Sequence, residues 1–346
     1  MRRVLWLPIF LSGVFIVDGS VVTPKVVIVD FYGDEANIWH DIPEFDLLAQ
    51  NISVPGLSSK FPDVHCTLDG EICQFVTDEG EINAAATATA FVLSPLFDLR
   101  QSYFLLGGVA GISPKYEFDA RERPEGAPTG YVPQGTTGVG QYPKYIYGTE
   151  VYELNDALRQ HALNFARNAT LNDTSDAQTY RALYEGGDTD YSAATAPPSV
   201  VACDTATSDV WYSGNLLAEA FESTMNLFTN GSAVFCTTQQ EDTGVLAALV
   251  RGNVAGLVDF TRVIAMRTAS DFDRPASGMQ AADNLFNGQN AGYGVSINNI
   301  YLAGVQVVQG ILSGWEATFA AGVKPKDYVG DIRGSLGGTP DFGPGV

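Results

Sequence analysis

The sequence predicts one α/β domain in which helices cover both faces of a largely parallel sheet. Short aliphatic and aromatic runs alternate with alanine-rich or amphipathic stretches, a pattern typical of parallel strands connected by helices. Of the 346 residues, 45% are hydrophobic and 17% are charged, whereas an average domain has about 25% charged residues. This composition excludes a disordered or collagen-like chain, because it supplies enough apolar surface for a large core. No internal repeat marks a second domain, so residues 21–346 are assigned to one.

Each element of this pattern has its own signal. Runs rich in Val, Ile, Leu and Phe predict strands at residues 25–30, 75–77, 103–106, 199–203 and 263–267. Alanine-rich or amphipathic stretches predict helices at residues 36–40, 82–93, 154–166, 216–228, 244–258 and 297–321. Between these elements we expect a glycine-rich turn at 107–111, a long loop at 121–141 and a surface excursion at 174–198.

The first 20 residues have the pattern of a secretory signal peptide. Arg2 and Arg3 precede an uncharged apolar run of about 14 residues, shorter than the ~20 that a membrane-spanning helix needs, and Gly19 and Ser20 follow it. We expect cleavage of residues 1–20 and a mature chain that is extracellular or in the cell wall; an uncleaved anchor is the alternative. The apolar stretch 297–321 carries several polar residues and an apolar face of helical period, so it predicts a packed helix and no transmembrane span.

The charge balance excludes several classes of partner. Lys and Arg number 19 against 40 Asp and Glu, which gives a formal net charge of -21. Such a surface repels phosphate backbones and anionic lipid headgroups, so no nucleic-acid polymer is expected as a partner. Small uncharged or cationic ligands remain.

The cysteines and glycosylation sequons agree with export. An even number of cysteines in an exported chain predicts two disulfides. Three pairings can be drawn; the shorter loops favour Cys66–Cys73 and Cys203–Cys236, and buried free thiols are the alternative. The sequons lie at Asn51, Asn168, Asn172 and Asn230. No metal site is expected, because the three histidines are scattered and no Cys-x-x-Cys motif occurs.

Acidic residues stand where several predicted strands end. Asp34 and Glu35 follow the first strand, Asp271 follows the last, and Glu241 precedes a helix. Ligands of such sheets bind beyond the carboxyl ends of the strands. Carboxylates there can accept hydroxyl hydrogen bonds, activate water, or donate a proton if burial raises their pKa. The alternative for each is a solvated surface acid or a helix N-cap. No P-loop, His-Glu-x-x-His or Gly-x-Ser-x-Gly motif occurs.

Ordered segments carry a resemblance to a known superfamily. Residues 25–35 (KVVIVDFYGDE), 80–85 (GEINAA), 106–112 (LGGVAGI) and 266–271 (MRTASD) resemble the purine nucleoside phosphorylase and methylthioadenosine nucleosidase superfamily. The leader and residues 204–214 are similar, more specifically, to the fungal purine nucleoside permease family, a branch of it. The resemblance implies a three-layer αβα fold of the nucleoside-phosphorylase type with a mixed, largely parallel central sheet. It implies a purine nucleoside as ligand and no cofactor.

The resemblance also implies roles for single residues. Glu241 matches the glutamate that binds the ribose hydroxyls, for which a carboxylate is suited because it accepts two charge-assisted hydrogen bonds. Asp271 matches the aspartate that protonates purine N7 as the glycosidic bond breaks. Glu35 matches the acid that activates water, although the alignment can slip by one residue to Asp34.

Aromatic and glycine positions complete the implied site. Trp211 falls where an aromatic ring stacks on the base and Tyr212 lies beside it; the alternative for both is a place in the core. Gly108 and Gly111 belong to the glycine-rich turn. Relatives complete their sites across subunits, so a homo-oligomer is implied as well.

Two departures bear on the reaction. The phosphorylases hold phosphate with an arginine and a serine near the glycine-rich turn, where this chain has Leu106 and Val109, and Gln240 replaces a methionine before the ribose glutamate. Arg267 and Arg274 are the cations near Asp271. We therefore expect a secreted protein that cleaves the N-glycosidic bond of purine nucleosides with water rather than phosphate. The alternative is a non-catalytic nucleoside-binding protein that acts in uptake with a membrane transporter as partner. A third interpretation is a fold that has lost its site.

Overall fold

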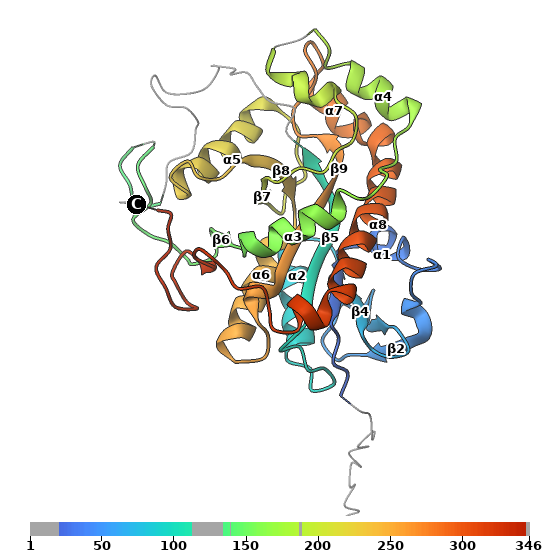
Figure 1. Cartoon of the computed structure of the whole chain (residues 1–346). Coiled ribbons are helices and arrows are strands. Elements are labelled where there is room, and N and C mark those ends of the chain that lie inside the picture. The colour runs from blue at the N-terminus through green and yellow to red at the C-terminus, as the bar shows by residue number, and fades with distance from the viewer. Residues whose placement is uncertain (1–20, 113–133, 139, 187–188, 344–346) are drawn as a thin grey trace, which may run out of the picture.

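The computed structural model describes residues 21–112, 134–138, 140–186 and 189–343 (Figure 1). The predicted leader and most of the loop expected at 121–141 lie outside the described residues. In the described part of the chain, an eight-stranded sheet has the order β2-β3-β4-β1-β5-β8-β7, with β9 also paired to β5. The strands are β1 (Val26–Asp30), β2 (Gln50–Ser53), β3 (Asp63–Cys66), β4 (Ile72–Val76), β5 (Tyr103–Ile112), β7 (Asp204–Thr207), β8 (Phe235–Gln239) and β9 (Val263–Phe272).

The sheet is mixed and largely parallel, as predicted. β4, β1, β5 and β9 are parallel neighbours, and β7 is parallel to β8. Antiparallel pairing joins β2 to β3, β3 to β4 and β5 to β8. The central strands are fully buried, because β1 and the first half of β5 consist of aliphatic and aromatic residues that are covered on both faces. Two short strands, β6 (Tyr152–Glu153) and β10 (Gly330–Asp331), form a separate antiparallel pair.

Helices cover both faces of the sheet and complete the three predicted layers. α2 (Glu81–Val92) and α6 (Asp242–Val254) pack on one face, and α3 (Asp156–Ala166) and α8 (Gln289–Ser313) pack on the other, each over its own apolar cluster (Figure 1). The remaining helices are α1 (Gly33–Asn37), α4 (Ser175–Ala182), α5 (Asn215–Phe228) and α7 (Ala281–Asn287), with shorter turns at Leu47–Ala49, Thr189–Thr195, Phe260–Arg262 and Trp315–Phe319.

α8 covers the first part of the C-terminal helix predicted at residues 297–321 and ends at Ser313. Among the described residues, only its stretch Ala291–Ser313 has the length and composition of a membrane span. Of the most apolar part of this stretch, 61% is buried inside the structure. Ile300, Val307 and Ile311 are fully covered and belong to the apolar cluster beneath α3. The helix therefore packs as a core element against β9 and β5.

Several predicted boundaries were wrong, each for a physical reason. The strand expected at 199–203 is irregular chain after Pro197 and Pro198, and the strand β7 begins only at Asp204. β7 is a polar edge strand, so it lacks the aliphatic signal. The segments that form β2, β3 and β8 were not recognised, because they are short and partly exposed. The excursion expected at 174–198 contains α4 and the turn Thr189–Thr195.

Both disulfides form with the favoured pairing. Cys66 and Cys73 face each other on the antiparallel strands β3 and β4 and are bonded. Cys203, directly before β7, is bonded to Cys236 in β8. The second bond closes a loop of 33 residues and so ties the far edge of the sheet together.

Candidate functional site

A change of partner along β5 creates the centre of the site. β5 pairs with β1 as far as Leu106, and its pairing with β8 begins only at Gly111. Between these points lies Val109, whose N–H donates to Oε1 of Glu35 at 2.7 Å and whose carbonyl accepts from Nη1 of Arg267 at 3.1 Å. Two charged side chains thus take the place of a neighbouring strand at one residue.

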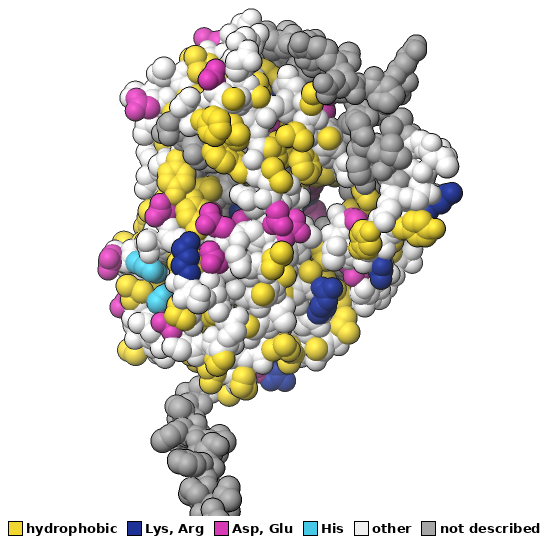
Figure 2. Space-filling view, turned by 180° about the vertical axis from the view of Figure 1, so that it is seen from behind, with side chains coloured by type: hydrophobic (Ala, Val, Ile, Leu, Met, Phe, Trp, Pro, Cys, Tyr) yellow, Lys and Arg dark blue, Asp and Glu magenta, His cyan; other side chains and the backbone are white. Residues whose placement is uncertain are grey.

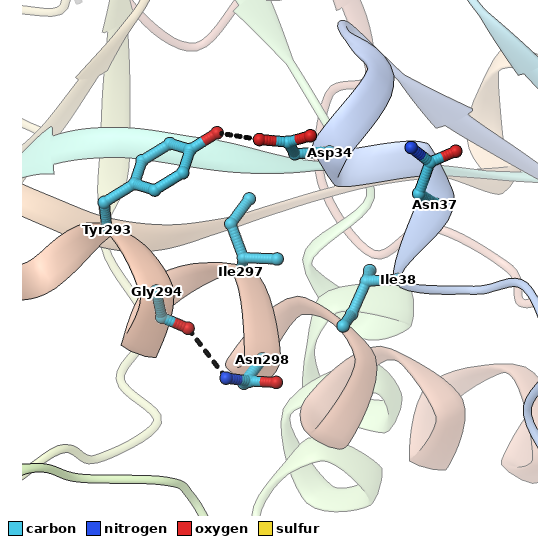
Figure 3. Close-up of a pocket in the computed structure, with 7 residues that line it drawn as sticks. All are labelled: Asp34, Asn37, Ile38, Tyr293, Gly294, Ile297 and Asn298. Carbon is cyan, nitrogen blue, oxygen red and sulfur yellow. Dashed lines mark hydrogen bonds between the residues drawn. The ribbon is translucent and has the colours of Figure 1, made fainter.

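The first turn of α1 places Glu35 in this gap. Its side chain is buried, and its second oxygen accepts the N–H of Phe31 at 2.8 Å. Burial raises the pKa of Glu35 to about 8, although Arg267 and the two N–H donors act in the opposite direction. Asp34, the alternative acid, is exposed and accepts a hydrogen bond from Tyr293 of α8 at 2.7 Å (Figure 3). The structure thus brings Glu35, and not Asp34, to the site.

Arg267 of β9 links the carboxylates around Val109. Its Nη2 contacts Oδ1 of Asp242 at 2.5 Å and Oε2 of Glu241 at 3.5 Å. The guanidinium also lies 4.0 Å from the centre of the Phe31 ring, where the aromatic face favours a cation. A buried charge needs such partners, because an isolated guanidinium in a dry interior is strongly destabilising.

Glu241 stands directly before α6. Its carboxylate is buried and accepts the N–H groups of Gly80 at 3.3 Å and Gln240 at 3.2 Å. Burial raises its pKa, while Arg267 lowers it. These contacts are long, so the carboxylate can exchange them for shorter bonds to ligand hydroxyls.

Asp271 lies at the end of β9 beside the exposed ring of Trp211. It accepts hydrogen bonds from the hydroxyl of Ser270 at 2.8 Å and from Nε1 of Trp211 at 3.3 Å. Burial raises the pKa of Asp271 and outweighs these two donors. Trp211 is 43% exposed, so a flat ligand can reach its ring, whereas Tyr212 is buried and stacks on Phe221 of α5. Of the two predicted base-binding residues, only Trp211 contacts Asp271.

The predicted glycine-rich turn is wrong, because β5 continues as a strand through Gly108 and Gly111. The glycines serve close approach instead. A Cβ on Gly108 would lie 2.6 Å from Nη1 of Arg267 and 2.8 Å from Oε1 of Glu35. A Cβ on Gly111 would lie 2.9 Å from the hydroxyl of Thr238. Leu106 is fully buried in the core, so it does not face the site.

A cavity large enough for a small ligand adjoins one part of this site. A cavity of about 810 Å³ between α3, α8 and β9 is lined in part by Arg267, Ser270 and Asp271, and its size is typical of ligand pockets. Glu35 and Glu241 are not among its lining residues. A shallower groove lies at Asp34 and Tyr293 (Figure 3). On the face opposite to that of Figure 1, acidic side chains form a band beside a hollow (Figure 2). Among the described residues, no group of three or more His, Cys, Asp or Glu side chains is arranged to hold a metal ion.

These observations define a three-layer α/β protein with buried carboxylates where its strands end. The chain belongs to the purine nucleoside permease family, whose model matches residues 23–117 and 114–324. The purine nucleoside permease of Candida albicans is 39% identical over 350 residues, which covers 94% of this chain and 84% of the relative. A probable purine nucleoside permease of Schizosaccharomyces pombe is 36% identical over 323 residues, which covers 86% of this chain and 91% of the relative. The family indicated by the sequence is confirmed.

Solved structures of bacterial nucleosidases are more distantly similar. A 5'-methylthioadenosine/S-adenosylhomocysteine nucleosidase of Neisseria meningitidis matches with a TM-score of 0.45 and 13% identity, covering 83% of this chain and 99% of that one. The futalosine hydrolase of Helicobacter pylori matches with a TM-score of 0.44 and 14% identity, covering 83% and 97%.

Sequence reasoning named Arg267 only as a nearby cation and missed its central position. Asp242 was missed, and Val109 was named only as a position that lacks a phosphate ligand, without its backbone contacts. The position of Arg267, four residues before Asp271 in the same strand, was the available signal. The contact of Val109 depends on which strands lie beside β5, and local sequence does not specify that.

Gly108→Ala tests the close approach at the centre of the site. We expect it to displace Glu35 or Arg267 and to lower the free energy of unfolding by about 1–3 kcal/mol, because the methyl group has no room. Gly107→Ala, one residue earlier in the same strand, is the matched control, since its Cβ would meet nothing closer than 3.8 Å. Denaturant unfolding of both variants measures the difference; equal stabilities would contradict the geometry.

Proposed function

We propose that this protein binds a purine nucleoside at Glu35, Glu241 and Asp271 and hydrolyses its N-glycosidic bond. The supporting observation is that these three carboxylates are buried and have raised pKa values. Arg267 contacts Glu241 and acts electrostatically on Glu35. The family, whose members are named for purine nucleosides, supports this ligand class.

Each carboxylate has a distinct part in the proposed reaction. Glu241 accepts hydrogen bonds from the vicinal hydroxyls of ribose. Asp271, whose pKa is raised by burial, donates its proton to N7 when it is protonated, and the bond between C1' and N9 breaks with its electron pair on the base. Glu35 takes a proton from water, whose oxygen bonds to C1'. Asp271 gives one proton and Glu35 takes one, so the reaction needs no reactant besides water.

The same geometry favours water over phosphate as the nucleophile. A phosphate needs several convergent donors, but the N–H of Val109 already donates to Glu35. Alternate peptide groups of a strand face opposite sides, so the neighbours of Val109 direct theirs toward β9. Arg267, the cation at this point of the described chain, is already held by Asp242 and Glu241. A water molecule needs only Glu35, which accepts its proton.

A second candidate function is binding without cleavage, as part of nucleoside uptake. The relatives are named permeases, which supports this alternative. The indole N–H of Trp211 donates to Asp271, which favours the ionised form of that acid while the site is empty. A transporter partner would then carry the ligand across the membrane.

Replacement of single acids separates these functions. We expect purified protein to release free base from inosine, adenosine or guanosine without phosphate. Asp271→Asn and Glu35→Gln should each lower kcat by about 100-fold or more, the usual contribution of a positioned acid or base. Asp34→Asn, a change one residue away at an exposed acid, is the matched control and should stay near wild type. Chromatography of the reaction follows base release.

Three other results would change the conclusion. If release of the free base required phosphate, this would contradict water as the nucleophile. Saturable binding without release would support the uptake alternative. Neither binding nor release would contradict the proposed function as a whole.

The pH dependence follows from the raised pKa of Glu35. The base must be ionised, and its pKa in the folded protein is about 8, so the ionisation of Glu35 by itself makes kcat/KM increase with pH up to about that value. Loss of the proton from Asp271 opposes this rise, because the ionised acid cannot protonate N7. A pH–rate profile of wild type and Asp34→Asn checks the prediction. Glu35→Gln removes this ionisation, so a residual rate in that variant with the pH dependence of wild type would show that Glu35 is not the base.

Export of the chain is part of the proposal. Asn51, Asn168 and Asn230 are exposed, and Asn172 is partly buried with its backbone bonded to Asn299. We expect glycans on the exposed sequons, and removal of N-linked glycans from the secreted protein should lower its apparent mass. N-terminal sequencing should begin near residue 21. An intracellular, unglycosylated protein that retains residues 1–20 would contradict export.

A further inference from the structure

The segment that carries Trp211 is joined to the segment that carries Asp271 by several hydrogen bonds. The N–H of Gly214 donates to the carbonyl of Asp273 at 2.8 Å. Asn284 of α7 donates to the hydroxyl of Ser213 at 3.0 Å and to the carbonyl of Phe272 at 2.8 Å. The two segments therefore form one unit.

A buried ion cluster lies directly behind this unit. Arg274 is fully buried; its Nη2 contacts Oε2 of Glu222 on α5 at 3.0 Å, and its Nη1 contacts Oδ2 of Asp273 at 3.4 Å. Glu219, also buried, lies one turn earlier on α5. The proposed reaction does not use any of these charged groups.

α5 is held at two adjacent positions. Tyr212 stacks on Phe221 with ring centres 4.8 Å apart and an angle of 19°, and Arg274 contacts the next residue, Glu222. A shift of α5 would thus move Tyr212, and with it the neighbouring Trp211. A buried charged cluster gives a core little extra stability, since apolar residues of similar volume are often as stabilising. Its directed bonds, however, fix one relative placement of the three elements.

We propose that Arg274 is a positioning residue, which holds the Trp211–Tyr212 segment against Asp271 through its bonds to Glu222 and Asp273. Its effect is to form the base-binding surface before the ligand arrives. Binding to such a surface avoids the entropy cost of ordering the segment, and an acid held in place can reach N7. The inference rests on the proposed function for its link to nucleosides, but the placement of Trp211 can be tested without a ligand.

The experiment compares three variants of the full mature chain with a control. Arg274→Met removes the cation, and Arg274→Met combined with Glu222→Leu removes one charge of each sign, so that Glu222 is not left buried without its cation. Arg274→Lys retains the charge without the two-pronged geometry. Arg262→Met is the control, because Arg262 is a buried arginine with an aspartate partner, Asp259 at 3.1 Å, near the start of β9.

Two measurements are made on each protein. The first is the NMR signal of the Trp211 indole N–H, assigned with Trp211→Phe, and its change with pH as Asp271 titrates. The second is the Kd for inosine by calorimetry, together with kcat and KM. A loss of overall stability alone would not move the Trp211 signal in a folded variant.

We expect the Arg274 variants to shift the Trp211 signal, to weaken its response to pH and to raise Kd by about tenfold, with a smaller effect in Arg274→Lys. Arg262→Met should leave both measurements near wild type. An unchanged Trp211 signal in folded Arg274→Lys or in the double variant would overturn the proposal. A wild type that binds no nucleoside would overturn the proposed function, and the ligand-free signal would still decide whether Arg274 positions Trp211.

Discussion

The exchange of neighbours along β5 is the constraint on which the site depends. A strand that leaves β1 before it meets β8 exposes peptide groups that must find other partners, because an unpaired buried peptide is costly. Glu35 and Arg267 supply those partners at Val109. The sheet thereby fixes the carboxyl group of Glu35 and the guanidinium of Arg267 at a defined point, and no flexible loop is needed to place them.

Buried charge in this protein is concentrated around a few arginines. Arg267 is shared between Glu241 and Asp242, and Phe31 covers its guanidinium. Because dehydration favours the neutral form of a carboxyl group, burial raises the pKa of Glu35 to about 8 and also raises the pKa of Glu241, although Arg267 acts in the opposite direction on both. The same low-dielectric surroundings make each remaining hydrogen bond stronger than it would be in water.

The sequence predicted the layers, the central strands and the family, because these follow from apolar period and from ordered motifs. It could not predict that residues 107–111 remain extended, since glycine is compatible with both a turn and a strand. It also left Glu35 and Asp34 unresolved; the direction of a side chain at a strand–helix junction depends on where the first turn of α1 begins. Arg267 was visible as a residue, but its partners come from segments distant in the chain.

The bond between Cys203 and Cys236 has a practical consequence for anyone who prepares this protein. It ties the start of β7 to β8, and β7 leads directly into the aromatic segment that ends at Gly214. In a reducing cytosol that bond would not persist, so a polar edge strand would be left with few ladder bonds to retain it. We expect recombinant material made there to keep its central sheet and to have a less firmly held β7, whereas an oxidising host compartment preserves the bond.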